Sequence, residues 1–172
     1  MTKGKTTKES MIEALCKLME TKKFQDIQIS EITEKAGVSR ISYYRNFESK
    51  EAILIAYMEQ KTKAFYEDHS EEDDETYLLH LFEHIKDYAD FIPLLYKNDL
   101  SYLFLQHIIN WFGRKGATSN LDEYANLASS YCIFGFLDAW IRHGMEPEPQ
   151  EMADKVIAYL KSKNIGIDFL RA

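Results

Sequence analysis

Apolar residues recur at intervals of three and four along most of the chain, which is the spacing of one face of an α-helix. The first such stretch runs to about Lys22 and follows Thr6 and Glu9, which have the spacing of a capping box. No stretch alternates in the manner of a strand, and no proline precedes Pro93. The pattern therefore predicts an all-α fold.

Capping residues and glycines divide this pattern into separate helices. Ser30, Ser39 and Ser49 are expected N-caps, and Gly37 is expected to supply the left-handed residue between two helices. The predicted helices run from about residue 7 to 22 and over 31–35, 40–46, 50–67, 77–89, 90–96 (interrupted by Pro93), 100–112, 121–143 and 150–163, with loops at 68–75, 113–120 and 144–149.

Residues 29–47 have the layout of a helix-turn-helix. Gly37 lies in the turn between two short helices, and the second helix begins after Ser39 with polar residues available for its outer face. The residues expected to lock the two helices together are apolar or aromatic: Ile32, Ala36, Val38, Tyr43 and Phe47. Pairs of helices with this geometry also occur in proteins that do not bind DNA.

Composition and charge are consistent with a folded domain that presents one end to a polyanion. The chain has 172 residues, of which 45% are hydrophobic and 28% charged. Its net charge of −7 is uneven, because residues 1–50 carry ten Lys or Arg and seven Asp or Glu, whereas the remainder carries eleven and twenty-one. Such an imbalance favours nucleic-acid binding only weakly, since many helical proteins share it.

Several kinds of site and location are not expected. Cys16 and Cys132 have neither metal-site spacing nor the number needed for a disulfide framework. His80 and His84 lie one turn apart beside Glu83, which is ligand-capable spacing, but an ordinary helix surface or core role is expected. No catalytic nucleophile with a base is recognisable. We therefore expect no metal, no cofactor and no enzymatic activity, and, without an apolar run of about 18 residues, a cytoplasmic protein without membrane contact.

The stretch over residues 24–54 resembles the N-terminal domain of TetR-family transcriptional regulators. The resemblance is carried by Ile32, by Ala36-Gly37-Val38-Ser39, by Tyr44-Arg45-Asn46-Phe47 and by Ser49-Lys50-Glu51. Residues 135–153 also resemble the C-terminal end of one branch of that family. The resemblance implies a three-helix DNA-binding domain over 1–50, a connecting fourth helix over 50–67, and a helical-bundle ligand-binding and dimerisation domain over 51–172.

The resemblance also implies roles for individual residues. The expected DNA contacts are Ser39, Arg40, Ile41, Ser42, Tyr44, Arg45, Asn46 and Lys50. Arg40 and Ile41 are expected nearest the base edges, and Tyr44 and Lys50 at phosphates. Ile41 departs from the family pattern, in which a small residue such as glycine is frequent. Arg45 has an alternative role as the partner of a nearby carboxylate.

The remainder of the chain is expected to hold an effector pocket and a dimer interface. The pocket residues expected between the body helices are Phe82, Phe104, Trp111, Tyr131 and Phe134, each with ordinary core packing as the alternative. The residues expected at a two-fold interface of the last two long helices are Leu127, Tyr131, Gly135, Val156 and Leu160, with packing inside one chain as the alternative.

The function expected from these assignments is a homodimeric repressor. It would bind a pseudo-palindromic double-stranded DNA operator and be released by a small apolar or aromatic effector. One alternative within the class is a regulator or activator that needs no effector. The alternative from another class is a helical protein-interaction module without ligand-controlled DNA release.

Overall fold

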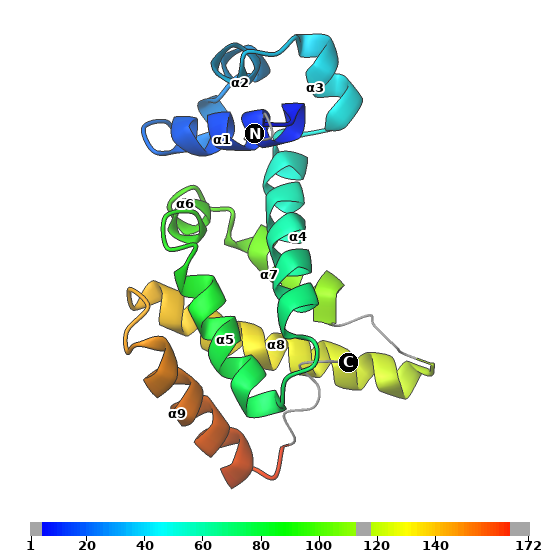
Figure 1. The fold of residues 1–172 in the computed structure, drawn as a ribbon, viewed down its shortest axis with the longest axis vertical. Helices are drawn as coiled ribbons and strands as arrows, with labels where there is room; N and C mark the ends of the chain where they lie inside the picture. Colours follow the sequence, from blue (N-terminus) through cyan, green and yellow to red (C-terminus); the bar gives the residue numbers. More distant parts are fainter. Residues whose placement is uncertain (1–4, 113–117, 166–172) are drawn as a thin grey trace.

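The computed structural model describes residues 5–112 and 118–165 (Figure 1). The helices in these ranges are α1 (Thr7–Met19), the 3-10 helix η1 (Phe24–Asp26), α2 (Ile29–Ala36), α3 (Arg40–Asn46), α4 (Lys50–His69), α5 (Asp74–Lys86), α6 (Ile92–Lys97), α7 (Ser101–Phe112), α8 (Asn120–Arg142) and α9 (Pro149–Ser162). The described residues contain no strand, so the predicted all-α fold is confirmed. Residues 113–117 of the predicted loop lie outside the described residues.

Side chains at the helix starts explain where the elements begin. At α1 the predicted capping box is present: Glu9 N–H donates to Thr6 Oγ1 over 3.2 Å, and Thr6 N–H donates to the Glu9 carboxylate over 2.7 Å. At α5 the Asp73 carboxylate accepts from two backbone N–H groups over 3.1 Å each. The helix therefore begins at Asp74, three residues earlier than predicted.

Helix α2 begins earlier than predicted, because the Gln28 N–H group is satisfied by a capping residue. This N–H group donates to the Glu31 carboxylate over 2.9 Å, so the helix begins at Ile29 and not after Ser30. Pro93 likewise does not interrupt the sixth helix. It occupies the second position of α6, where its missing N–H costs no intrahelical bond.

The helices form a head and a body joined by α4 (Figure 1). Helices α1 to α3 pack together at one end, and α4 runs from them into the body, where it contacts α5 and α7. In the body, α5 packs along α9 and α7 packs along α8. Within the described ranges, none of these helices has the combination of length and apolar character needed to cross a membrane.

Trp140 joins three parts of the body. Its ring is 2% exposed and meets the edge of Phe82 with ring centroids 5.1 Å apart, which links α8 to α5. Its Nε1–H donates to the Pro147 carbonyl over 2.8 Å and so fixes the segment that leads into α9. Burial of a large aromatic side chain with its polar atom satisfied makes Trp140 a principal contributor to the core.

Candidate nucleic-acid interface

The turn between α2 and α3 depends on a left-handed residue. Gly37 has φ +66°, and its N–H donates to the Glu34 carbonyl over 3.1 Å. A side chain at that backbone conformation is strained, which explains the glycine. Ile32 on α2 and Tyr43 on α3 are completely buried, so their packing fixes α3 against the rest of the head.

The outer face of α3 carries cationic and apolar side chains without an evident structural role. Ile41 is 65% exposed and Tyr44 is 58% exposed, and both point away from the core. Arg40 and Arg45 are also exposed, and neither forms an ion pair within the described part of the chain. The alternative role of Arg45 as a carboxylate partner is therefore not seen among these residues.

Three of the other expected contact residues, Ser39, Ser42 and Asn46, form hydrogen bonds within α3 and at its cap. Ser39 caps the helix by accepting from Ser42 N–H over 3.1 Å, and the two hydroxyl oxygens are 3.0 Å apart. The Asn46 side chain donates to the Ser42 carbonyl over 2.7 Å. Ser39 is exposed, whereas Ser42 and Asn46 are half-buried, so Ser39 is the most accessible of the three.

Lys50 lies at the start of α4 and is engaged within the head. Its ammonium group donates to the carbonyls of Phe24 and Ile27 over 2.6 and 2.7 Å and lies 4.5 Å from the Phe24 ring centroid. Burial lowers the pKa of Lys50 below its ordinary value. An ammonium group has three donors, so one remains for a phosphate, and that contact stays a prediction.

Tyr43 and Tyr44 are neighbours with opposite environments. Their rings meet edge to face with centroids 5.2 Å apart. The Tyr43 hydroxyl is buried and has no hydrogen-bond partner among the described residues. Tyr44 is open to solvent on the outer face.

A second contact joins the head to the body beside α4. The Phe24 N–H group of η1 donates to the Asn98 side-chain oxygen over 2.7 Å, and Lys97 Nζ donates to the Glu20 carbonyl over 3.0 Å. Both body residues lie at the C-terminal end of α6. The head is therefore held by α6 as well as by its covalent connection to α4.

Two family models match the chain, and together they cover both the head and the body. The model described as bacterial regulatory proteins of the tetR family matches residues 11–57, and the model described as transcriptional regulator C-terminal region matches residues 72–162. The second match alone spans more than half of the chain. The chain belongs to the TetR family. Its helix-turn-helix lies within the first of these two matches.

A curated relative matches the N-terminal part of the chain. This TetR-family chain is 33% identical over 60 residues to the HTH-type transcriptional regulator EthR of Mycolicibacterium smegmatis (strain ATCC 700084 / mc(2)155). The match covers 35% of this chain and 28% of the relative. It supports the assignment of the family, and it does not extend to the relative's full length.

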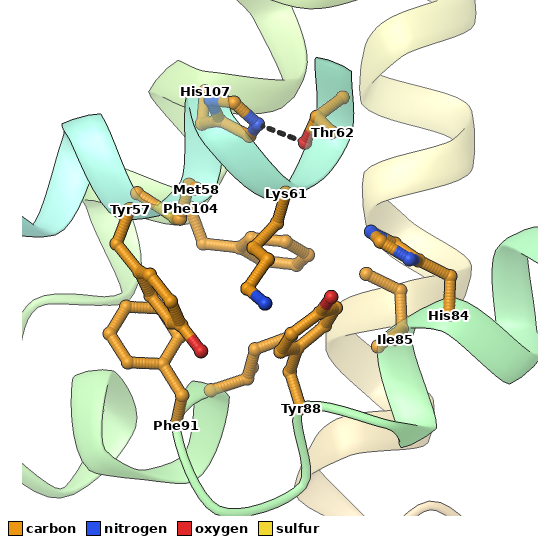
Figure 2. Close-up of a pocket in the computed structure, with 11 residues that line it drawn as sticks. Tyr57, Met58, Lys61, Thr62, His84, Ile85, Tyr88, Phe91, Phe104 and His107 are labelled. Carbon is orange, nitrogen blue, oxygen red and sulfur yellow. Dashed lines mark hydrogen bonds between the residues drawn. The ribbon is translucent and has the colours of Figure 1, made fainter. Parts of the chain in front are cut away.

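A small cavity lies beneath α4 in the body of this TetR-family chain (Figure 2). Its wall comes mainly from α4, α5 and α7, with Tyr57, Lys61, His84, Tyr88, Phe104 and His107 among the lining residues. The free volume is about 30 Å³, which is room for about one water molecule. A drug-sized molecule therefore requires the surrounding helices to move apart.

The cavity differs from the pocket expected from the sequence. Phe104 lines it, whereas Phe82, Trp111, Tyr131 and Phe134 do not. Phe82 is buried against Trp140, and Tyr131 is 55% exposed on α8. Three further lining residues are not among the pocket residues predicted from the sequence: Tyr57 and Lys61 on α4, and Tyr88 in the turn after α5. The available signal was their spacing, because Tyr57 and Lys61 are four residues apart and Tyr88 follows His84 by four.

Two histidines of the cavity wall are held neutral by burial. Burial lowers the pKa of His107 and of His84 from the ordinary 6.5 to about 4. Thr62 Oγ1 lies 2.7 Å from His107 Nε2, so a neutral ring has its partner (Figure 2). Protonation of either ring is therefore unfavourable in the folded chain.

The free energy of unfolding is expected to fall between pH 6.5 and pH 4. The unfolded chain binds protons at these rings below about pH 6.5, whereas the folded chain does so only near pH 4, so the stabilisation is complete above that window and is lost as the pH falls through it. For His107 the loss from pH 7 to pH 5 is expected to be about 1–2 kcal/mol. Urea unfolding at the two pH values measures it.

A matched pair of variants isolates the contribution of His107. His107→Gln is expected to reduce the difference between the two pH values, whereas His143→Gln, at an exposed histidine, should leave it unchanged. An equal difference in all three proteins would contradict the assignment.

Helix α8 presents an apolar stripe to solvent. Its exposed members recur at intervals of three and four residues: Leu121, Tyr124, Ala128, Tyr131, Gly135 and Ala139. Leu127 lies beside the stripe and is half-buried. A continuous exposed stripe of this kind on a helix is typical of a surface that contacts another protein.

Two residues expected at the dimer interface have a different place in the fold. Val156 and Leu160 are each 1% exposed, because α9 packs along α5 within the same chain. This corrects their assignment to the interface, since side chains buried in one chain cannot contact a second. Tyr159 is an exposed large hydrophobic residue of α9, and its ring centroid lies 5.5 Å from that of Phe136 on α8.

Proposed function

We propose that this TetR-family regulator is a homodimeric repressor that binds a pseudo-palindromic operator and is released by a small effector. The observation that supports it most strongly is the outer face of α3, where Arg40, Ile41 and Tyr44 are exposed on a helix fixed by a buried inner face. In a symmetric dimer, two such helices would enter successive major grooves about 34–36 Å apart.

The residues of α3 and its flanks would divide into base contacts and phosphate contacts. Arg40 would donate to the acceptor edge of a guanine, and Ile41 would contact a thymine methyl group. Tyr44, Arg45 and the third donor of Lys50 would contact phosphates, which position the head without selecting a sequence. Ser39, Ser42 and Asn46 would lie at the edge of this surface, with Ser39 the best placed of them.

Effector release would use the cavity beneath α4. Because the free volume of the cavity is about 30 Å³, an effector would bind only a state in which α4 and the body helices are further apart. The effector would weaken DNA binding by no more than the ratio of its affinities for this open state and for the DNA-binding state. Lys61 Nζ lies 5.5 and 5.1 Å from the ring centroids of Tyr57 and Tyr88 (Figure 2). These groups favour an aromatic effector that carries an anionic or acceptor group.

Dimerisation would use the stripe on α8, with Tyr131, Gly135 and the adjacent Leu127 near its middle. Its exposed apolar side chains, with a glycine that permits close approach of helices, support a two-fold helix pairing. A regulator without an effector, or an activator, would share the same head and dimer. An interaction module without DNA binding would leave the exposed arginines of α3 without a role.

Selection of duplexes from a random DNA pool tests this proposal. The purified chain is expected to enrich a palindrome with two half-sites and to bind it as a dimer, with an affinity that falls steeply as the salt concentration rises. Weak binding to every sequence alike would instead favour the interaction module.

The two adjacent tyrosines provide a matched test of the DNA-binding face. Tyr44→Phe is expected to weaken binding to all duplexes by about tenfold, because one phosphate hydrogen bond is lost. Tyr43→Phe removes the same atom from a buried position and is expected to leave binding unchanged while raising stability by up to about 1 kcal/mol. Fluorescence anisotropy and urea unfolding measure the two effects. Equal losses of binding in both variants would contradict the docking.

A further inference from the structure

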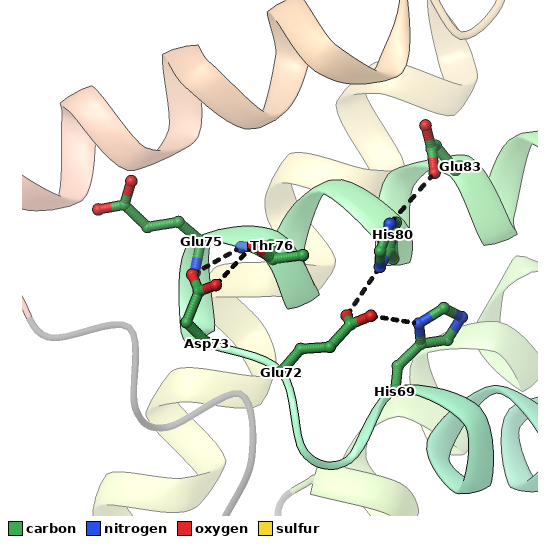
Figure 3. A network of polar contacts seen from close by, with 7 residues as sticks. All are labelled: His69, Glu72, Asp73, Glu75, Thr76, His80 and Glu83. Carbon is green, nitrogen blue, oxygen red and sulfur yellow. Dashed lines mark hydrogen bonds and ion pairs between the residues drawn. The ribbon is translucent and has the colours of Figure 1, made fainter.

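Two histidines and a carboxylate meet where α4 ends and α5 begins (Figure 3). His69 lies in the last turn of α4, Glu72 lies in the connection, and His80 lies on α5. Their ligand-capable atoms all lie within 4.8 Å of one another, and this is the one group of three such residues found in residues 5–112 and 118–165. The histidine spacing in the sequence did not indicate it, because His84 and not His69 is the neighbour of His80 along a helix.

The three side chains converge on one point. His69 Nδ1 lies 3.0 Å from one oxygen of Glu72, and His80 Nδ1 lies 2.7 Å from the other. Although partial burial opposes it, hydrogen bonding from both rings keeps the pKa of Glu72 below its ordinary value. The carboxylate is therefore ionised at neutral pH and available as a ligand.

The surroundings hold both rings in this orientation. The His69 ring packs on Phe65 with centroids 4.7 Å apart. The outer nitrogen of His80, Nε2, lies 3.9 Å from a Glu83 carboxylate oxygen. In metal sites, a carboxylate that accepts a hydrogen bond from the far nitrogen of a histidine fixes the ring and increases electron donation from the near nitrogen to the metal, and Glu83 lies close to the position for this role.

We propose that His69, Glu72 and His80 form a binding site for a divalent transition-metal ion of the zinc class. Two imidazole nitrogens and one carboxylate are a donor set that Zn²⁺ accepts, with water in the fourth position, whereas Mg²⁺ and Ca²⁺ prefer oxygen ligands alone. The side chains are 25–29% exposed, so an ion can reach them from solvent.

The geometry requires only a small adjustment. Ligand atoms around tetrahedral Zn²⁺ are about 3.3–3.4 Å apart at bond lengths near 2.0–2.1 Å, so the most distant pair here needs to approach by about 1–1.5 Å. Each imidazole now donates its Nδ1 proton to Glu72. On coordination through Nδ1, that proton leaves to solvent and Nε2 takes one up, so the ring stays neutral and, in His80, Nε2–H faces Glu83.

An ion at this position would join the end of α4 to α5. The two histidines come from different helices. Coordination would replace their two hydrogen bonds to Glu72 by bonds from all three side chains to one metal ion. Metal binding of this kind stabilises the folded chain against the unfolded one. Binding is therefore expected to raise the melting temperature as well as to give a spectroscopic signal.

Titration of the chelator-treated full chain with Co²⁺ and with Zn²⁺ tests the site. The wild-type chain is expected to bind one equivalent, with Co²⁺ giving visible d–d absorption and Zn²⁺ displacing it. His80→Ala and Glu72→Gln are each expected to weaken binding by at least 10–100-fold and to abolish the rise in melting temperature. Glu72→Gln keeps the shape of the side chain, so it separates loss of a ligand from loss of the fold.

Two further variants complete the test. His143→Ala removes an exposed histidine far along the chain from the cluster and is expected to leave binding unchanged. Glu83→Gln, which alters only the carboxylate beyond His80, is expected to weaken binding to a smaller degree than Glu72→Gln. Absence of one-equivalent binding in the wild-type chain, or wild-type affinity in both His80→Ala and Glu72→Gln, would overturn the proposal.

Discussion

Arginine in place of Gly135 is expected to leave the chain folded but monomeric. Gly135 is exposed on α8, and a Cβ added there would meet no heavy atom of another element of the described chain within 4 Å, so the fold is expected to tolerate a side chain that points into solvent. In the proposed dimer the same position faces a second copy of α8, where a long charged side chain separates the helices. Because two linked heads bind two half-sites together, operator affinity is expected to fall by roughly 10²–10⁴-fold.

Analytical ultracentrifugation and operator binding measure the two parts of this prediction. Gln60→Arg, which adds the same charge at an exposed position of α4, is the control and is expected to remain dimeric. The dimer surface proposed on α8 would have to be abandoned if Gly135→Arg sedimented as a dimer with unchanged operator affinity. Loss of helical signal in the variant would contradict the open space around Gly135.

Alanine in place of Trp140 is expected to destabilise the chain by about 3–5 kcal/mol. The substitution empties the space between α5 and α8 that the ring fills against Phe82, and it removes the donor to the Pro147 carbonyl. A loss of this size is a large part of the stability of a single domain. Urea unfolding followed by circular dichroism, at fixed protein concentration, measures it.

Phenylalanine at the same position separates packing from hydrogen bonding. Trp140→Phe keeps an aromatic ring and loses Nε1–H. It is therefore expected to lower the free energy of unfolding by about 1–3 kcal/mol in total, which is less than the loss in Trp140→Ala. If Trp140→Ala lost under about 1 kcal/mol, the central place of this side chain in the core would be refuted.

The head could be predicted closely from the sequence because its elements depend on local chemistry. The bounds of α3 follow from the Ser39 cap, and the turn before it follows from Gly37, since both effects act within a few residues. The sequence predicts the start of α5 three residues late, because an acidic run indicates a loop without showing that Asp73 is the capping residue.

The body could be predicted only as a set of helices. Which face of a helix is buried depends on its neighbours in space, and the pairing of α9 with α5 is what places Val156 and Leu160 in the core. The cavity and the histidine cluster likewise depend on the distance between α4 and α5, which helical spacing does not determine. His84 lies four residues from His80 in the sequence, yet it lines the cavity and is not part of the cluster. His69 is eleven residues from His80, and the packing of α4 near α5 brings the two together.

The hydrogen bond from the Phe24 N–H group to the Asn98 side chain makes the exchange rate of one backbone amide depend on the contact between the head and α6. That N–H is held by a side chain of the body and not by a carbonyl of the head. Its exchange with deuterated solvent is slow while the contact with α6 persists and speeds up whenever the head lifts away. The exchange rate of this single amide, compared with and without an added compound, therefore detects movement of the head before any operator is known.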